Sequence, residues 1–171
     1  MFPKISFMLV FVFWCFSGVF AQGLSLGEKK PEVMDGIEYG YIIKNEQVKS
    51  ARGEEFARFE LTLYATNKSG CTKLYADHLS FHSEEAPNII AVFSCINANG
   101  KRLTSKGSTV KSRDFYVNAL INEGGKQVSQ SVKAGYIFRN GETLKSNIIV
   151  LVPLGERPVI QFTSNNLPEL R

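Results

Sequence analysis

The two histidines, His78 and His82, are the residues of this chain best suited to metal binding or proton transfer near neutral pH. On a helix, an H-x-x-x-H pair shares one face and can hold one metal ion. The surrounding segment DHLSFHS alternates like a strand instead, which places the imidazoles about 13 Å apart at roughly 3.3 Å per residue. We therefore interpret them as solvent-facing histidines near a loop and expect no metal or other cofactor. A single helical turn is the alternative, with Asp77, Glu84 or Glu85 completing a site.

Nucleophilic and acid–base catalysis have no recognisable motif in the sequence. It contains no G-x-S-x-G segment, and Gly124-Gly125-Lys126 lacks the upstream spacing and the following Ser or Thr of a phosphate-binding loop. Paired carboxylates for glycoside hydrolysis leave no local signature, but the sixteen acidic residues are scattered among positions expected to face solvent. We therefore predict that the protein is not an enzyme.

Two cysteines, Cys71 and Cys95, remain once the N-terminal segment that holds Cys15 is removed. An even number of cysteines in an oxidising compartment favours one intramolecular disulfide, so we predict a bridge between Cys71 and Cys95. Closing a loop of about 25 residues would stabilise the fold by roughly 3.5 kcal/mol by constraining the unfolded chain. The alternative is two separate buried thiols.

A basic stretch, KRLTSKGSTVKSR, contains five cations and no acid. It predicts either a patch for an anionic glycan, a lipid head group or an acidic partner surface, or a lysine-rich strand edge that resists strand addition, and we favour the edge. The five cations are Lys101, Arg102, Lys106, Lys111 and Arg113. The whole chain has 20 Lys and Arg against 16 Asp and Glu, and this net charge of +4 is too low for a nucleic-acid-binding footprint.

Residues 1–21 have the order of regions found in a secretory signal peptide. Lys4 supplies the positive charge, Ile5 to Phe16 is an apolar run without charge, and small residues precede a cleavage point that we place after Ala21. The alternative is an uncleaved anchor, but Ile5 to Ala21 is shorter than the roughly 20 apolar residues that span a bilayer. The sequence therefore predicts a secreted, periplasmic or cell-surface protein that meets the membrane only through its signal peptide before cleavage.

The elements that must position these residues are strands, because apolar and polar residues alternate through most of the chain. The clearest case is Phe59 to Thr66, where every second residue is apolar. We expect an irregular lead-in over residues 22–35, one domain over residues 36–164 and a tail over residues 165–171. The domain is predicted to be an all-β antiparallel β-sandwich of about nine to ten strands, with a closed barrel as the alternative.

Turn residues and apolar runs predict how the strands are arranged. The segments Asn88 to Ile96 and Ser146 to Val152 are apolar on both faces, which is typical of strands in the centre of a sheet. Turns at Asn67 to Gly70, Glu123 to Gly125 and Asn140-Gly141 each predict a hairpin between the strands that flank them.

Two segments, Phe59 to Gly70 (FELTLYATNKSG) and Gly141 to Phe162 (GETLKSNIIVLVPLGERPVIQF), carry a family resemblance. The first resembles the opening strand and Asn-Ser turn of immunoglobulin-like domains in bacterial exported proteins and lipoproteins of unknown function, and the second is similar to their closing strands. The chain departs from this pattern because it lacks the lipid-attachment cysteine and has a long middle section. The resemblance implies an immunoglobulin-like sandwich in a surface-exposed setting, and it transfers no catalytic residues.

Export, the strand-rich pattern and the missing catalytic motifs together predict a non-enzymatic binding or structural module at the cell surface or in the envelope. Its partner is expected to be a macromolecule, such as an anionic surface glycan or another envelope protein, and not a nucleic acid. The alternative is a small secreted hydrolase or a lipocalin-like ligand carrier, either of which requires a concave site. The sequon Asn67-Lys68-Ser69 adds a glycosylation site if the source glycosylates asparagine.

Overall fold

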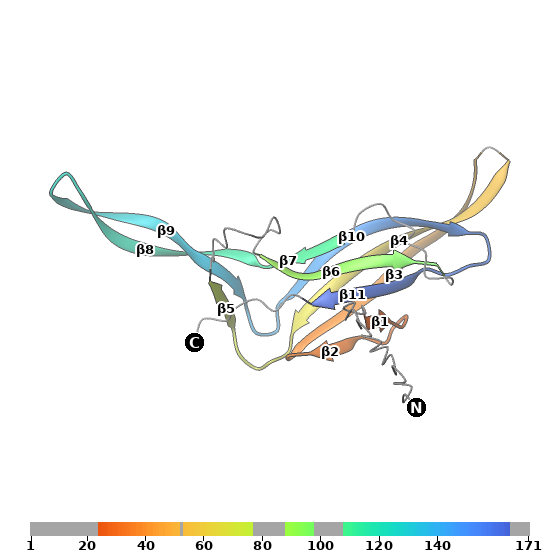
Figure 1. The fold of residues 1–171 in the computed structure, drawn as a ribbon, viewed down its shortest axis with the longest axis horizontal. Coiled ribbons are helices and arrows are strands. Elements are labelled where there is room, and N and C mark those ends of the chain that lie inside the picture. The colour runs from red at the N-terminus through yellow and green to blue at the C-terminus, as the bar shows by residue number, and fades with distance from the viewer. Residues whose placement is uncertain (1–23, 52, 77–87, 98–107, 165–171) are drawn as a thin grey trace, which may run out of the picture.

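The computed structural model describes residues 24–51, 53–76, 88–97 and 108–164, which form eleven strands and no helix (Figure 1). The strands are β1 (Leu24–Leu26), β2 (Glu32–Met34), β3 (Ile37–Ala51), β4 (Glu54–Asn67), β5 (Lys73–Ala76), β6 (Ile89–Ile96), β7 (Ser108–Lys111), β8 (Arg113–Glu123), β9 (Lys126–Phe138), β10 (Thr143–Pro153) and β11 (Val159–Ser164). The predicted all-β class is confirmed. The predicted signal peptide and C-terminal tail lie outside the described residues.

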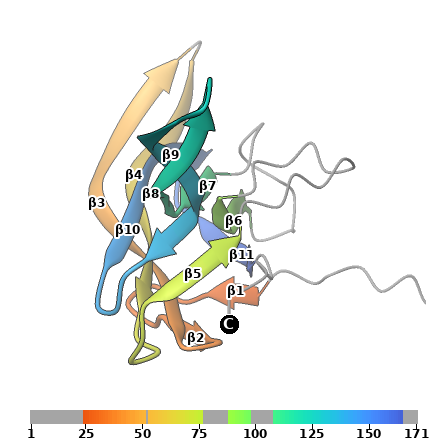
Figure 2. The same cartoon turned by 90° about the vertical axis from the view of Figure 1, so that its left-hand side faces the viewer.

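Two four-stranded antiparallel sheets pack against each other as a β-sandwich. One has the strand order β1-β11-β6-β7 and the other β10-β4-β3-β2, and Figure 2 shows them as two layers. Strand β4 contacts β6 and β7 across the interior. Along one side the layers meet where the Ser108 hydroxyl lies 2.9 Å from that of Ser146.

The interior of the sandwich is filled by the alternating apolar residues of its central strands. In β4 the inward side chains are Ala57, Phe59, Leu61, Leu63 and Ala65, all buried. Tyr39 of β3 stacks on Phe162 of β11 with ring centroids 4.6 Å apart, and Phe93 of β6 packs beside Phe162. Because burial disfavours the phenolate, the pKa of Tyr39 is raised well above its ordinary value.

Of the two fully apolar strands, one lies in the centre of a sheet as predicted and the other does not. Strand β6 lies between β11 and β7, as its composition predicts. Strand β10 was expected in a sheet centre but occupies an end of its sheet and pairs with β4. Its outward residues Ile149 and Leu151 are 54% and 49% exposed, because the outer face of this sheet is open at these positions.

The lead-in over residues 22–35 was expected to be irregular, and this is wrong. Strand β1 pairs with β11 and β2 pairs with β3, so this segment contributes an edge strand to each sheet of the sandwich. A Gly27–Lys30 bridge connects the two strands. Both strands have only three residues, too few for an apolar alternation to be visible in the sequence.

A third sheet, with strand order β5-β9-β8, leaves the sandwich at one end. Strands β8 and β9 pair along nearly their whole length, whereas β9 pairs with β5 only over its last residues, Gly135 to Phe138. The remainder of the hairpin therefore projects away from the sandwich (Figure 1). We call this projecting part, from Tyr116 to Lys133, the arm.

Two of the predicted hairpins are instead connections between sheets. The turn after Asn67 leads from β4 to β5, and the turn at Asn140-Gly141 leads from β9 to β10, and neither pair of strands is hydrogen-bonded to each other. The residue types gave the turns correctly but not the partners of the flanking strands. The turn at Glu123 to Gly125 does join paired strands, β8 and β9, as predicted.

The side chain of Asn67 ties these two connections together. It is fully buried, and its Nδ2 donates to the carbonyl oxygens of Cys71 and Phe138, both at 2.9 Å. Its Oδ1 accepts from the backbone nitrogen and the hydroxyl of Ser69 at 3.1 and 2.6 Å. The nitrogen that a glycan would occupy is therefore engaged and enclosed, so the sequon at Asn67 is not a glycosylation site in the folded protein.

Candidate functional site

Several of the residues singled out from the sequence lie outside the described part of the chain. These are His78, His82, Lys101, Arg102 and Lys106. Of the basic stretch, the structure describes Lys111 and Arg113, which are exposed and flank the buried Ser112. Arg113 is held by an ion pair of 2.8 Å to Glu142, so part of its charge is neutralised within the chain. The polyanion patch stays a prediction.

The predicted disulfide is absent, and Cys71 and Cys95 are free thiols. Cys71 is exposed in the turn beyond β4, whereas Cys95 is buried in β6, in the opposite sheet of the sandwich. Disulfides require Cα atoms within about 7 Å, so the even cysteine count gave the wrong answer.

The described residues hold no group of three or more His, Cys, Asp or Glu side chains that could bind a metal ion. They also include no helix that is long and apolar enough to cross a membrane.

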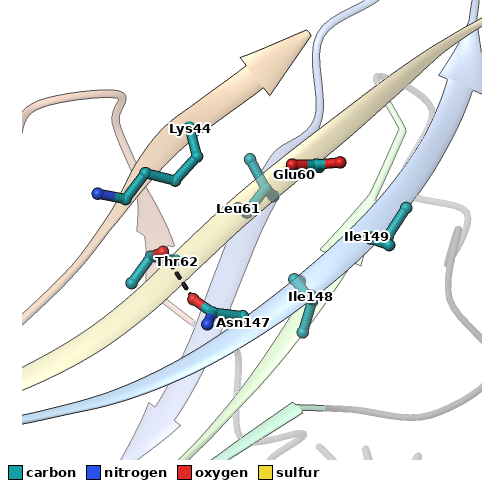
Figure 3. Close-up of a pocket in the computed structure, with 7 residues that line it drawn as sticks. All are labelled: Lys44, Glu60, Leu61, Thr62, Asn147, Ile148 and Ile149. Atoms are coloured by element: carbon teal, nitrogen blue, oxygen red, sulfur yellow. Dashed lines mark hydrogen bonds between the residues drawn. The ribbon is translucent and has the colours of Figure 1, made fainter. Parts of the chain in front are cut away.

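A shallow depression of about 550 Å³ lies on the open face of the β10-β4-β3-β2 sheet (Figure 3). Lys44, Glu60 and Asn147 are among its lining residues, and the Thr62 hydroxyl donates to Asn147 Oδ1 at 2.7 Å. Glu60 is the one carboxylate in this lining, and it forms an ion pair with Arg58. A paired carboxylate or an imidazole for acid–base chemistry does not line this depression.

The arm presents the largest group of exposed apolar side chains in the described structure outside the sandwich. Residues directly opposite each other in an antiparallel pair share a face, and on one face of the arm these residues are mostly aliphatic. They are Val117, Ala119, Ile121, Val128 and Val132, which we call the apolar stripe. The three valines are 39%, 41% and 40% exposed. On the other face Leu120 is 70% exposed and Tyr116 is 56% exposed.

The backbone of the arm is equally unusual for a surface element. A two-stranded hairpin on its own is only marginally stable in water. Strand β8 ends the order β5-β9-β8, so no strand of the described residues pairs with its outer edge. Between Asp114 and Glu123 it carries no charge (FYVNALIN), whereas exposed edges usually carry charge or proline.

The two ends of the arm are well defined. Gly124 and Gly125 turn the tip with φ angles of +60° and +82°, a combination that two-residue hairpin turns require. At the base, Lys133 forms an ion pair of 3.1 Å with Asp114 and donates to the Tyr136 hydroxyl at 3.0 Å. Its ammonium also lies 4.1 Å from the centre of the Tyr136 ring, a cation–π contact. The arm is thus anchored to the body at its base, and within the described part of the chain no third strand pairs with it.

Sequence reasoning identified both strands of the arm but not its projection from the sandwich. The alternation from Phe115 to Ile121 and the turn at Glu123 predicted the hairpin. The prediction placed these strands within the sandwich, because periodicity reports which residues share a face and not what covers that face. A signal was present in the side chains, since the apolar stripe lacks the Phe and Leu side chains that fill the interior from β4.

Comparison with protein-family models, with curated proteins and with solved structures gives no significant match to this chain.

Proposed function

We propose that this chain is an exported, non-enzymatic β-sandwich protein that works by contact with another macromolecule at the cell surface or in the envelope. The contact surface in this proposal is the apolar stripe of the arm. The observation that carries the proposal is the exposure of aliphatic side chains along a hairpin that projects from the body (Figure 1). Exposed apolar patches on an otherwise well-packed protein mark interaction sites.

The same proposal includes the immunoglobulin-like character of the sandwich and its delivery by a signal peptide. The packing of the body supports it, since aromatic and aliphatic side chains fill the interior between the two sheets. A filled interior suits a rigid module that displays loops and hairpins at its ends.

The alternative function, a small secreted hydrolase or a ligand carrier, would use the depression on the open sheet face. One carboxylate already paired with Arg58 gives weak support for acid–base catalysis there. The arm has no role in that alternative, and this difference separates the two functions experimentally.

The test is a triple substitution in the stripe, Val117→Ser, Ile121→Ser and Val132→Ser, in cells that export the protein. We expect the wild type to remain with the envelope fraction after washing and the triple variant to be released. The matched control is Val48→Ser, at a valine that is 60% exposed near the tip of the β3–β4 hairpin, and it should leave retention unchanged. Equal retention of the wild type and the triple variant would overturn the proposal.

A further inference from the structure

We infer that the open edge of β8 pairs with β8 of a second copy of this chain, in an antiparallel and two-fold symmetric arrangement. This inference goes beyond the proposed function, because it concerns the edge of the arm rather than its face. It also predicts association of the purified protein alone. The argument rests on the residues along β8, which complement themselves when the strand is reversed.

Full-length pairing of β8 with its copy is centred on Asn118, the middle residue of Arg113–Glu123. In this register Arg113 lies opposite the second copy's Glu123, and symmetry repeats the same contact at the other end. Isologous interfaces have this property, because each contact occurs twice. Opposite charges that face each other across neighbouring strands stabilise the pairing.

The residues between the two charged ends also match. Phe115 falls opposite the second copy's Ile121, and Val117 falls opposite its Ala119. All of these positions have odd numbers and lie on one face of the strand, so the apolar stripes of the two copies join across the interface. On the other face Tyr116 meets Leu120, and the two Asn118 amides meet at the symmetry axis.

Neighbouring registers lack this complementarity. Centring on Val117 places Arg113 opposite the second copy's Ile121, and centring on Ala119 places Glu123 opposite its Phe115. A charged group opposite an apolar one loses its pairing partner and part of its solvation. The existing ion pair to Glu142 does not compete, because it uses Nε of Arg113 and the guanidinium has further N–H donors.

The edge of β8 suits pairing with a second copy better than the edge of β9 does. Strand β9 carries lysines at Lys126 and Lys133 and an unpaired residue, Ala134, at the register shift opposite Phe115 and Tyr116. Bulges and lysines disfavour strand addition. Strand β8 contains no lysine, and the extra residue at the register shift beside Phe115 and Tyr116 belongs to β9 rather than to β8.

The first test measures association by sedimentation equilibrium of the purified protein over a micromolar dilution series. We expect a reversible dimer for the wild type. Glu123→Lys would place a lysine opposite Arg113 of the other copy, and symmetry repeats this repulsive contact at the other end. The dissociation constant of the dimer should therefore rise at least about tenfold. The double variant Arg113→Glu with Glu123→Lys exchanges the charges and should restore association above that of either single variant.

The matched control is Glu55→Lys, the same charge change at an exposed position near the tip of the other long hairpin, where association should stay unchanged. A wild type that remains monomeric throughout the series overturns the inference, whether or not the arm binds another macromolecule. Equal effects of Glu123→Lys and Glu55→Lys, or no recovery in the double variant, also overturn it.

The second test addresses the register through disulfide crosslinking in a Cys71→Ser background. In the proposed pairing the two Asn118 side chains face each other, within reach of a disulfide after small adjustments. The two Asn122 side chains lie about 26 Å apart, eight residues along the strands. Asn118→Cys should therefore form a covalent dimer under mild oxidation and Asn122→Cys should not. Equal crosslinking from both positions would contradict the register.

Discussion

The sandwich and the arm are built from the same kind of strand, but only the sandwich has a second sheet that covers one apolar face. Phe59 and Leu63 of β4 are completely buried between two sheets, whereas Val117 and Val132 of the arm face solvent. Both regions alternate apolar and polar residues along long antiparallel pairs. The same pattern is covered by a second sheet in the sandwich and faces solvent in the arm, where we propose that it serves contact with a partner.

The second long hairpin shows that projection alone does not require an apolar face. The tip of the β3–β4 hairpin, at the end of the molecule opposite the arm (Figure 1), is lined by exposed polar residues such as Lys49, Glu54 and Glu55. Charged side chains keep such an edge solvated and unpaired. The arm differs from this hairpin because its β8 strand carries no charge from Phe115 to Asn122.

The largest expected effect sharpens the contrast between covered and exposed apolar residues. Phe162→Ala removes a buried ring that packs on Tyr39 and Phe93, and we expect the free energy of unfolding to fall by about 3–5 kcal/mol. Leu120→Ala on the arm should change it by less than about 0.5 kcal/mol. Urea unfolding followed by circular dichroism measures both values. Similar losses from the two variants would mean that the arm belongs to the core.

The next effect concerns the junction between the two regions. Asn67→Ala removes the partners of the Cys71 and Phe138 carbonyl groups and of Ser69, inside a buried site. We expect a loss of about 3 kcal/mol in the free energy of unfolding. The control Asn140→Ala lies in an exposed part of the adjacent turn and should cost less than about 0.5 kcal/mol. Equal melting temperatures for the two variants would refute the claim that Asn67 holds the two connections together.

A smaller effect tests the same contrast within one strand. Val150 of β10 is 1% exposed and its neighbour Ile149 is 54% exposed. Val150→Ala should lower the free energy of unfolding by about 2 kcal/mol, and Ile149→Ala by less than about 1 kcal/mol. The reverse order would show that β10 is covered on its outer face.

The two thiols have little effect on stability near neutral pH but differ clearly in reactivity. Burial raises the pKa of Cys95 to about 11 from an ordinary value of 9.0, which alone lowers its thiolate fraction about 100-fold near neutral pH. At pH 8 a thiol reagent should label Cys71 rapidly and Cys95 only after unfolding. Because the folded state holds the Cys95 proton that the unfolded chain releases, the free energy of unfolding should fall as the pH rises from 9.0 to about 11. If neither cysteine were labelled in protein unfolded without reductant, the two residues would instead be joined by a disulfide.

The sequence predicted the strands themselves well, because side-chain alternation is a local property. The segment Phe59 to Thr66 became part of β4 with every expected apolar residue inside. The turn at Glu123 to Gly125 was also correct, since two glycines suit the positive φ angles of its tip.

The partners of the strands could not be predicted in the same way. A turn such as Asn140-Gly141 fixes a local change of direction, and the next strand can pair with any sheet that lies within reach. The apolar run in β10 has the composition of a covered strand, yet its outer face is open. The distance between Cys71 and Cys95 depends on which sheets their strands join, which a count of cysteines does not contain.

The most direct test of the account is photo-crosslinking in cells that export the protein, with a photoreactive residue placed at Ile121 in the stripe or at Val48 on the other hairpin. We predict covalent adducts from position 121, including one with a partner other than this chain, and none from position 48. No adduct from position 121, or equal adducts from both positions, would contradict the claim that the arm is the contact surface.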